Sequence, residues 1–277
     1  MEYFTHERIS KRIIRIVDIS DTASYLVEGN EKACLIDTGS GIGSLRAYVD
    51  SLTNLAYDVV LTHGHVDHAS GAWEFKDKKV YLHPEDCELM KVHTVFDNRT
   101  GYVENVKKIT IPEEDLIPQL DPAETLEIAH GDIFDLGDVH VEIVHTPGHT
   151  RGMCMVLIQE ERTILFDDGC GVSVMLLDEY STSVEEYLDV LKHLKKKEES
   201  HDYIIRNHGT FVSPKELLDN VIECAQLVIR EEDDHVPAVG LPVYYEDAYF
   251  AKALKPNGHG RLDGKEGNLA YRPCKIH

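Results

Sequence analysis

The stretch THGHVDHASG, residues 62–71, constrains the fold more than any other part of the chain. It places three histidines and an aspartate at positions 63, 65, 67 and 68. The mostly apolar residues 57–61 predict a short strand, and Gly64 interrupts that pattern, so the four polar residues are expected on a strand-to-helix turn. A lone histidine on such a turn is usually solvated or caps a helix, but imidazoles crowded this closely repel one another once protonated. A divalent cation uses them neutral, so we interpret the cluster as metal ligands.

Three later segments repeat this arrangement of a strand that ends in polar residues. The strand predicted at 139–144 runs into HTPGHT, the apolar residues 164–166 end in two aspartates, and the strand at 203–205 is followed by RNHGT. If the four strand ends meet at one edge of a sheet sandwich, they offer more ligands than one tetrahedral ion uses. They suit two ions bridged by a carboxylate and a water. The candidate ligands are His63, His65, Asp67, His68, His149, one of Asp167 or Asp168, and His208.

Together these motifs resemble those of the metallo-β-lactamase superfamily. HGHVDH, HTPGH, the strand-terminal aspartate and a final HG follow in the family's order, after an early IDTG at 36–39, and the similarity runs from about Ile14 to Gly209. The resemblance implies an α/β fold, an αββα sandwich of two mixed β-sheets flanked by helices, with a dinuclear site at one edge. It implies a first metal held by His63, His65 and His149, a second held by Asp67, His68 and His208, and a bridging aspartate.

The bridging aspartate is one of two neighbours. Members of the family often have Thr-Gly-Asp after the phenylalanine, but position 169 here is Gly. A shorter spacing places the ligand at Asp168 and leaves Asp167, the alternative, where a small residue is usual. On an extended strand the two side chains point to opposite faces, so only one is expected to reach the metals. Four other residues are expected to support the structure or the ligands instead: Asp37, Thr62, His145 and Cys170.

The ligand types indicate both the metals and the reaction. Imidazole and carboxylate ligands suit Zn(II), and Fe(II) or Mn(II) tolerates them. Two divalent metal ions per chain lower the pKa of bound water from 15.7 to about 7, which makes hydroxide available for attack. The expected substrate is an acyl ester, thioester or lactone, as in the glyoxalase II-like and lactonase-like branches that the motifs resemble. Asp67 is expected to orient the nucleophile and to carry a proton to the leaving group.

Three alternatives stay open at this stage. One is a phosphodiesterase or nuclease of the same superfamily. Another is a flavodiiron-type oxidoreductase, which is disfavoured because those proteins typically have Glu where this chain has His65, and because the chain has no room for a flavodoxin domain. The third is a metal-binding protein without catalysis.

Charge and hydropathy limit the partners. Fifty acidic and 28 basic residues give a net charge of −22, which disfavours nucleic acids because their binding depends on Lys and Arg contacts with phosphates. A small-molecule substrate is expected instead. No run approaches the roughly 18 apolar residues of a membrane span, and residues 1–10 lack the apolar core of a signal peptide. The six cysteines contain no CxxC pair. We therefore expect a cytoplasmic protein with reduced thiols and no membrane partner.

The chain is expected to form a single domain over 1–277, in which 240–277 is an extension beyond the resemblance. Its aromatic residues, Tyr244, Tyr245, Tyr249 and Phe250, predict a pocket wall, a contact in a homo-oligomer, or part of the core. Helices are expected at 43–52, at 69–75, from Pro84, from a capping box at Ser183 and Glu186, and after Ser213. Residues 94–120 lack periodicity and are expected to form a rim loop.

Overall fold

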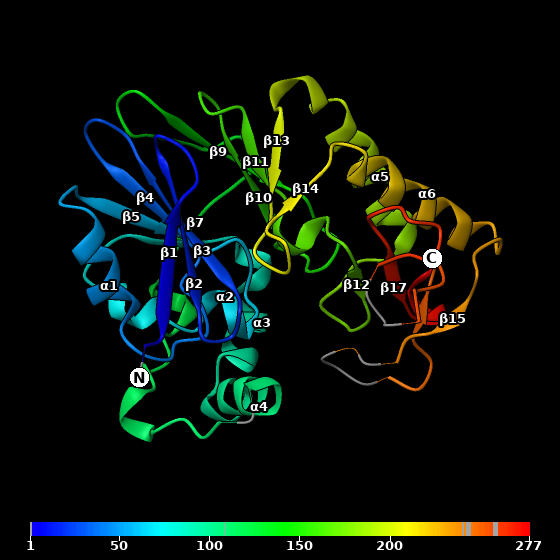
Figure 1. The fold of residues 1–277 in the computed structure, drawn as a ribbon, viewed down its shortest axis with the longest axis horizontal. Helices are drawn as coiled ribbons and strands as arrows, with labels where there is room; N and C mark the ends of the chain where they lie inside the picture. The colour runs from blue at the N-terminus through cyan, green and yellow to red at the C-terminus, as the bar shows by residue number, and fades with distance from the viewer. Residues whose placement is uncertain (1, 108, 240, 242–244, 257–259) are drawn as a thin grey trace.

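Two β-sheets pack face to face at the centre of the molecule (Figure 1), in a computed structural model that describes residues 2–107, 109–239, 241, 245–256 and 260–277. The first sheet has the order β1 (Phe4–Arg8), β2 (Ile13–Asp18), β3 (Ala23–Glu28), β4 (Ala33–Ile36), β5 (Tyr57–Val60), β6 (Val80–Leu82) and β7 (Leu126–Glu127). Its strands are antiparallel from β1 to β4 and parallel from β4 to β7.

The second sheet has the order β14 (Val212–Ser213), β13 (Tyr203–Ile205), β11 (Thr163–Leu165), β10 (Cys154–Ile158), β9 (His140–His145) and β8 (Ile133–Asp135). Within this second sheet the described strands pair in antiparallel fashion except β11 and β13, which are parallel. Both sheets are therefore mixed. Apolar side chains from alternate positions of both sheets fill the space between them, among them Val27, Ile36, Ile143 and Val156. This central layer holds the ends of β5, β9, β11 and β13 close together.

Helices cover the outer faces of both sheets, which completes the αββα sandwich predicted from the sequence. On the first sheet lie α1 (Leu45–Leu52), α2 (Val66–Ala69) and α3 (Cys87–His93), and on the second lie α5 (Val184–Lys195) and α6 (Leu217–Ile229). A further helix, α4 (Phe96–Lys107), lies beyond α2, where its Val103 packs with Ile42 and Ile111. Short 3-10 turns connect these elements: η1 (Ala72–Phe75), η2 (Pro84–Asp86), η3 (Glu113–Asp115), η4 (Pro122–Glu124), η5 (Asp167–Gly169), η6 (Glu198–Ser200) and η7 (Pro273–Lys275).

Local sequence signals explain α5 well. Ser183 accepts from the backbone of Glu186, and the Glu186 side chain accepts from the backbone of Ser183, so the predicted capping box is confirmed. The buried face of the helix also matches the prediction, with Val184, Tyr187, Leu188, Leu191 and Leu194.

One loop prediction and three helix predictions need correction. Residues 94–120 are not all loop, because α4 lies within them; it buries Arg99 as well as Val103, and a helix that buries a charged side chain shows no apolar period. The helix expected at 69–75 is two shorter turns, of which α2 begins after His65. Pro84 opens η2 and α3 follows, while Ser213 belongs to β14 and α6 begins at Leu217.

A third, smaller sheet includes much of the C-terminal segment. Its order is β12 (Val174–Leu176), β17 (Leu269–Tyr271), β16 (Tyr249–Phe250) and β15 (Val236–Pro237). Leu269 and Tyr271 are buried against α5 and α6, so part of the segment completes the core. Tyr244 lies outside the described residues. The assignment of 1–277 to one domain stays a prediction.

None of the described helices is both long enough and apolar enough to cross a membrane.

Candidate metal centre

The four polar strand ends predicted from the sequence meet at one edge of the two sheets. His63 follows β5, His149 follows β9, Asp168 follows β11 and His208 follows β13. The first strand belongs to the first sheet and the other three to the second. The site therefore lies across the seam between the sheets.

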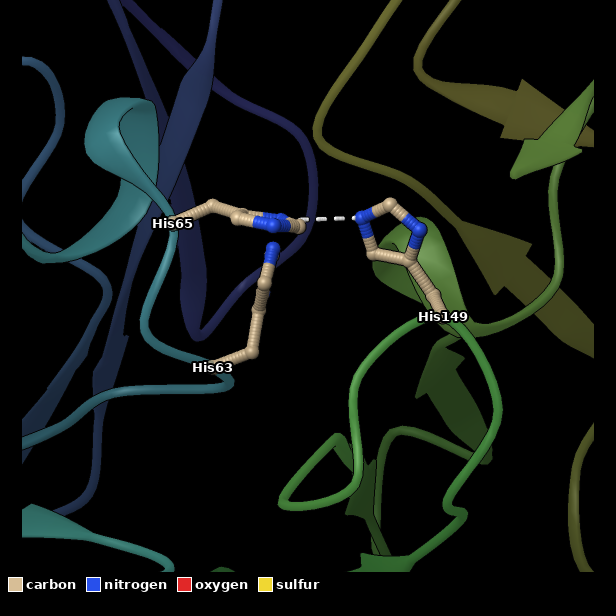
Figure 2. Close-up of side chains that lie close together, drawn as sticks. All are labelled: His63, His65 and His149. Atoms are coloured by element: carbon tan, nitrogen blue, oxygen red, sulfur yellow. Dashed lines mark hydrogen bonds between the residues drawn. The ribbon is translucent and has the colours of Figure 1, made fainter. Parts of the chain in front are cut away.

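Three histidines form the first group. His63, His65 and His149 each offer a ring nitrogen, and these atoms lie within 4.8 Å of one another. The Nε2 atom of His149 is 3.0 Å from Nδ1 of His65, and Figure 2 shows the three rings directed toward one another. With Zn–N bonds of about 2.0–2.1 Å, two nitrogens on one tetrahedral zinc lie roughly 3.4 Å apart. The spacing suits a shared cation.

A second group lies beside the first and contains Asp67, His68 and His208. Both Asp67 and His68 are on α2, which continues directly from the histidine turn. The Nε2 atom of His208 lies 3.3 Å from Nε2 of His68 and 3.4 Å from Oδ2 of Asp67. These three residues also offer ligand atoms within 4.8 Å of one another.

Asp168 lies between the two groups. Its Oδ2 atom is 3.6 Å from Nε2 of His149 and 3.7 Å from Nε2 of His68, and its Oδ1 atom is 3.5 Å from Nε2 of His208. The carboxylate thus faces nitrogens of both groups. All seven candidate ligands predicted from the sequence are brought together in this way.

Asp167 contacts the opposite side of the same rings. Its Oδ2 atom is 3.4 Å from Nδ1 of His63, and its Oδ1 atom is 3.6 Å from Nδ1 of His68, the nitrogens that face away from Asp168. The sequence argument placed the two aspartates on an extended strand, and this was wrong. They lie in η5, where Asp167 has a left-handed φ of 50°, and this turn directs the two carboxylates to different sides of the histidines.

Three of the donor residues, His63, His65 and Asp168, are in the states that a cation requires, whereas at His68 and His208 neighbouring carboxylates outweigh burial and raise the pKa, so a cation has to displace a proton there. Burial lowers the pKa of His63 and His65 well below the usual value, so both imidazoles are neutral. Burial raises the pKa of Asp168, but His208 and His68 outweigh it, and its pKa lies well below the ordinary value. Within the described part of the chain, Nε2 of His63 is buried without a hydrogen-bond partner. A buried nitrogen left this way costs about 1–3 kcal/mol, so the group fits a bound cation better than an empty site.

Asp37 and Thr62 hold the second group from behind. Asp37 accepts hydrogen bonds from the backbone and hydroxyl of Thr62, and from the amide of Asn207. Its Oδ2 atom is 3.0 Å from Nδ1 of His68. The carboxylate fixes the ring so that Nε2 points toward Asp168 and His208.

Sequence reasoning missed Asp86. This buried carboxylate accepts from the backbone of Gly64 at 2.9 Å, from the hydroxyl of Thr150 at 2.7 Å and from the backbone of Gly152 at 2.7 Å. It therefore ties the turn of His63 and His65 to the turn of His149. A Cβ on Gly64 would lie 2.8 Å from the Asp86 carbonyl oxygen, so the approach requires glycine. The available signal was another polar stretch, HPED, directly after β6.

A separate group lies close by and contains His83, Glu85 and His145. The two imidazole rings stack with centroids 3.9 Å apart. Nε2 of His145 is 2.9 Å from the Arg151 carbonyl oxygen, so this nitrogen carries the proton and donates. His145 thus secures the end of β9, the structural role expected for it.

This fold and site define a class, and comparison with known proteins identifies it. The chain belongs to the metallo-β-lactamase superfamily, whose model matches residues 17–200. Members of this superfamily are mostly hydrolases and typically bind metal ions, and this chain is a metallo-β-lactamase superfamily hydrolase with side chains able to hold metals.

Among its relatives is the human acyl-coenzyme A thioesterase MBLAC2, which is 27% identical over 202 residues, or 64% of this chain and 70% of that protein. An uncharacterized protein of Aquifex aeolicus is 28% identical over 163 residues, 56% of this chain and 70% of that protein. These identities show distant relationship within the superfamily.

Solved structures share the fold. A metallo-β-lactamase from Pontibacter korlensis has a TM-score of 0.55 at 16% identity, covering 80% of this chain and 99% of that one. The sec-alkylsulfatase Pisa1 from Pseudomonas sp. has a TM-score of 0.63 at 13% identity, covering 82% of this chain and 42% of that one. At such identities the likeness shows the αββα architecture alone.

Proposed function

We propose that the protein binds two divalent metal ions and hydrolyses an acyl bond in a small molecule, with thioesters as the first class to test and esters and lactones next. The observation that carries the proposal is the pair of three-residue groups joined by Asp168. The thioesterase activity named for the MBLAC2 relative supports the choice of thioesters.

In this proposal each group of ligands binds its own metal ion. His63, His65 and His149 hold the first ion, Asp67, His68 and His208 hold the second, and Asp168 bridges them. The mixed imidazole and carboxylate set favours Zn(II) and tolerates Fe(II) or Mn(II). When bound, such ions supply Lewis acidity and a water that ionises near neutral pH.

Asp67 is the proposed proton carrier. Burial raises its pKa, but His68 and His208 outweigh it and lower the pKa, so the side chain is a carboxylate at neutral pH. Thr22 donates to its Oδ2 atom at 3.2 Å and restricts the rotation of the group. A carboxylate held in this way accepts a proton from a water and delivers it to the leaving group.

The charge of the chain and the state of its cysteines support the proposed substrate class and the proposed location. The net charge of −22 opposes binding of polyanions, which favours a small acyl substrate over a nucleic acid. The cysteines of the described structure are free, and Cys34, Cys154, Cys170 and Cys224 are buried, as suits a reducing compartment. We propose that the protein acts in the cytoplasm.

The test is an activity screen of zinc-loaded protein against acyl-CoA thioesters, lactones, simple esters and phosphodiesters. Turnover of at least one acyl class is expected, and it should disappear after chelation and return with metal. Phosphodiester cleavage without any acyl hydrolysis would instead support a phosphodiesterase. Protein that binds no transition metal after reconstitution would contradict the proposal altogether.

A further inference from the structure

We propose that the C-terminal segment 268–277 positions His149 for its metal. This inference rests on the proposed function, because it assumes that His149 is a ligand. The segment lies outside residues 17–200, the range matched by the superfamily model. Two sets of contacts connect it to His149, one through β12 and one through the loop 177–182.

The first set of contacts fixes the imidazole ring. Nδ1 of His149 is 2.9 Å from the carbonyl oxygen of Met175 in β12. This contact places the proton on Nδ1 and leaves the Nε2 lone pair directed at the site. β12 pairs in parallel with β17, Met175 opposite Ala270, and the backbone of Val174 donates to the carbonyl of Asn268 at 3.0 Å. In the described sheet β12 lies at the edge, so β17 is its strand neighbour.

The second set of contacts fixes the backbone of His149. The hydroxyl of Ser181 donates to the His149 carbonyl at 2.9 Å. Nζ of Lys275 in turn donates to the Ser181 carbonyl at 2.7 Å, and Nη1 of Arg272 donates to the Leu177 carbonyl at 3.1 Å. The two basic side chains therefore hold both ends of the loop that binds His149.

Backbone contacts extend this attachment. The amide of Thr182 donates to the Gly148 carbonyl at 2.9 Å, and the amide of Glu185 donates to the Ile276 carbonyl at 3.1 Å. The loop is thus bonded to the turn of His149, and the first turn of α5, which follows the loop, is bonded to the C-terminal segment.

The same loop also reaches a second histidine of the first group. The ring of Tyr180 meets the ring of His93 edge to face with centroids 5.7 Å apart. His93 stacks on His65 with centroids 5.0 Å apart. A shift of the loop would therefore disturb both His149 and His65.

In the second group, the supports of His68 and Asp67 lie elsewhere. His68 rests on Asp37, and Asp67 accepts from Thr22, both of which are within the range matched by the superfamily model. Loss of the C-terminal contacts should therefore weaken the first metal and spare the second.

Lys275 is the residue that tests the idea most directly. Among the described residues its ammonium group forms no ion pair within 4.0 Å, and it donates to the Ser181 carbonyl. Its removal should therefore act through the loop and not through a lost ion pair. Lys252 offers a matched control, because it is in the same C-terminal region but pairs with Asp234 at 2.7 Å.

The experiment measures the two stepwise Co(II) dissociation constants by chelator competition and follows binding by visible absorption. Lys275→Met and Ser181→Ala should each weaken one step by about 10-fold, the lower end of the range for residues that support a ligand. Lys275→Arg should restore the affinity, and Lys252→Met should match the wild type. The weakened step should persist in a His208→Ala background, which keeps the first group, and vanish in a His65→Ala background.

The outcomes separate the inference from the proposed function. Normal affinities for both steps in Lys275→Met and Ser181→Ala, or equal weakening of both, would overturn the positioning role while the dinuclear site stands. Wild-type protein that binds no Co(II) would overturn both. Circular dichroism of each variant excludes unfolding as the cause of a selective loss.

Discussion

At the scale of single residues, the two neighbouring aspartates give the sharpest prediction. Asp168 faces Nε2 of both His68 and His149, whereas Asp167 faces the Nδ1 atoms behind the site. Asp168→Asn removes the bridging charge and keeps the shape, so metal content should fall and turnover should be lost. Asp167→Ala removes only a contact behind the rings of His63 and His68. Loss of such a support typically lowers metal affinity or activity by about 10- to 100-fold.

Metal analysis and steady-state kinetics on both variants check this prediction. Asp167→Asn serves as the matched control for the amide substitution. If Asp167→Ala were inactive and metal-poor while Asp168→Asn kept both metals, the bridging ligand would be one residue earlier than proposed.

His208 gives a prediction about protons. Burial lowers its pKa, but the carboxylates of Asp168 and Asp67 outweigh it and raise the pKa to about 9 in the metal-free protein. This value is above the usual one of about 6.5, so the protonated form stabilises the fold fully below about pH 6.5, and that stability is lost as the pH rises toward 9. The Tm of metal-free protein should therefore fall over this range.

Metal should reverse this dependence because it replaces the proton on the ring. Calorimetric titration at about pH 8 in two buffers of different ionisation enthalpy should show proton release on metal binding. His208→Asn should release fewer protons and should show a flatter dependence of Tm on pH. Equal heats in the two buffers for wild-type protein would count against this linkage.

At the scale of elements, Asp86 joins two turns that come from different sheets. Its carboxylate satisfies three donors, on Gly64, Thr150 and Gly152. Asp86→Ala should leave these donors unsatisfied and lower the free energy of unfolding of the metal-free protein by about 2–4 kcal/mol. Denaturant unfolding measures the loss. Asp77→Ala is the control, because Asp77 forms an exposed pair with Arg46 and should cost about 0–1 kcal/mol.

That the candidate ligands come together was more predictable from the sequence than the elements around them. His63, Asp168 and His208 each follow an apolar strand directly, so local pattern alone places them at strand ends, and packing of two sheets brings those ends together. Asp86 follows the same rule after β6. The sequence alone did not distinguish it, because Pro84 makes the same stretch typical of a helix start.

Elements that depend on distant partners were less predictable. α4 buries Arg99, so its sequence shows no apolar stripe. β12 and β17 have three residues each and exist because they pair across almost a hundred positions, which no local pattern reveals. Likewise the left-handed turn at Asp167 depends on its surroundings and not on a glycine at that position.

At the scale of the whole molecule, the charge of −22 and the C-terminal aromatic residues bear on association. Tyr245 is partly buried against the small sheet, and Tyr249, in β16 of that sheet, packs against the cluster that contains α5 and α6, which accounts for part of the aromatic cluster. Homo-oligomer formation through this segment stays a prediction. A net charge this far from zero favours separate molecules by mutual repulsion, which any subunit contact must overcome.

The metals themselves should hold the two sheets together. In the first group His63 follows β5 of the first sheet and His149 follows β9 of the second, and in the second group His68 and His208 span the sheets in the same way. An ion at 100 times its dissociation constant adds about 2.7 kcal/mol to the stability of the folded state. In chains approaching this length, each kcal/mol of stability changes the Tm by about 2–4 °C. Removal of two ions by a chelator should therefore lower the Tm by on the order of 10 °C.

Calorimetric scans with and without chelator measure this shift. Asp168→Asn provides the internal comparison, because a variant that cannot retain its metals should unfold at nearly the same temperature in both conditions. Loss of the shift in that variant would tie the stabilisation to the bridged site and not to metal bound elsewhere on this acidic surface. An unchanged Tm for wild-type protein at saturating metal would show that no ion links the two sheets, and the assignment of ligands from both sheets to each ion would then be wrong.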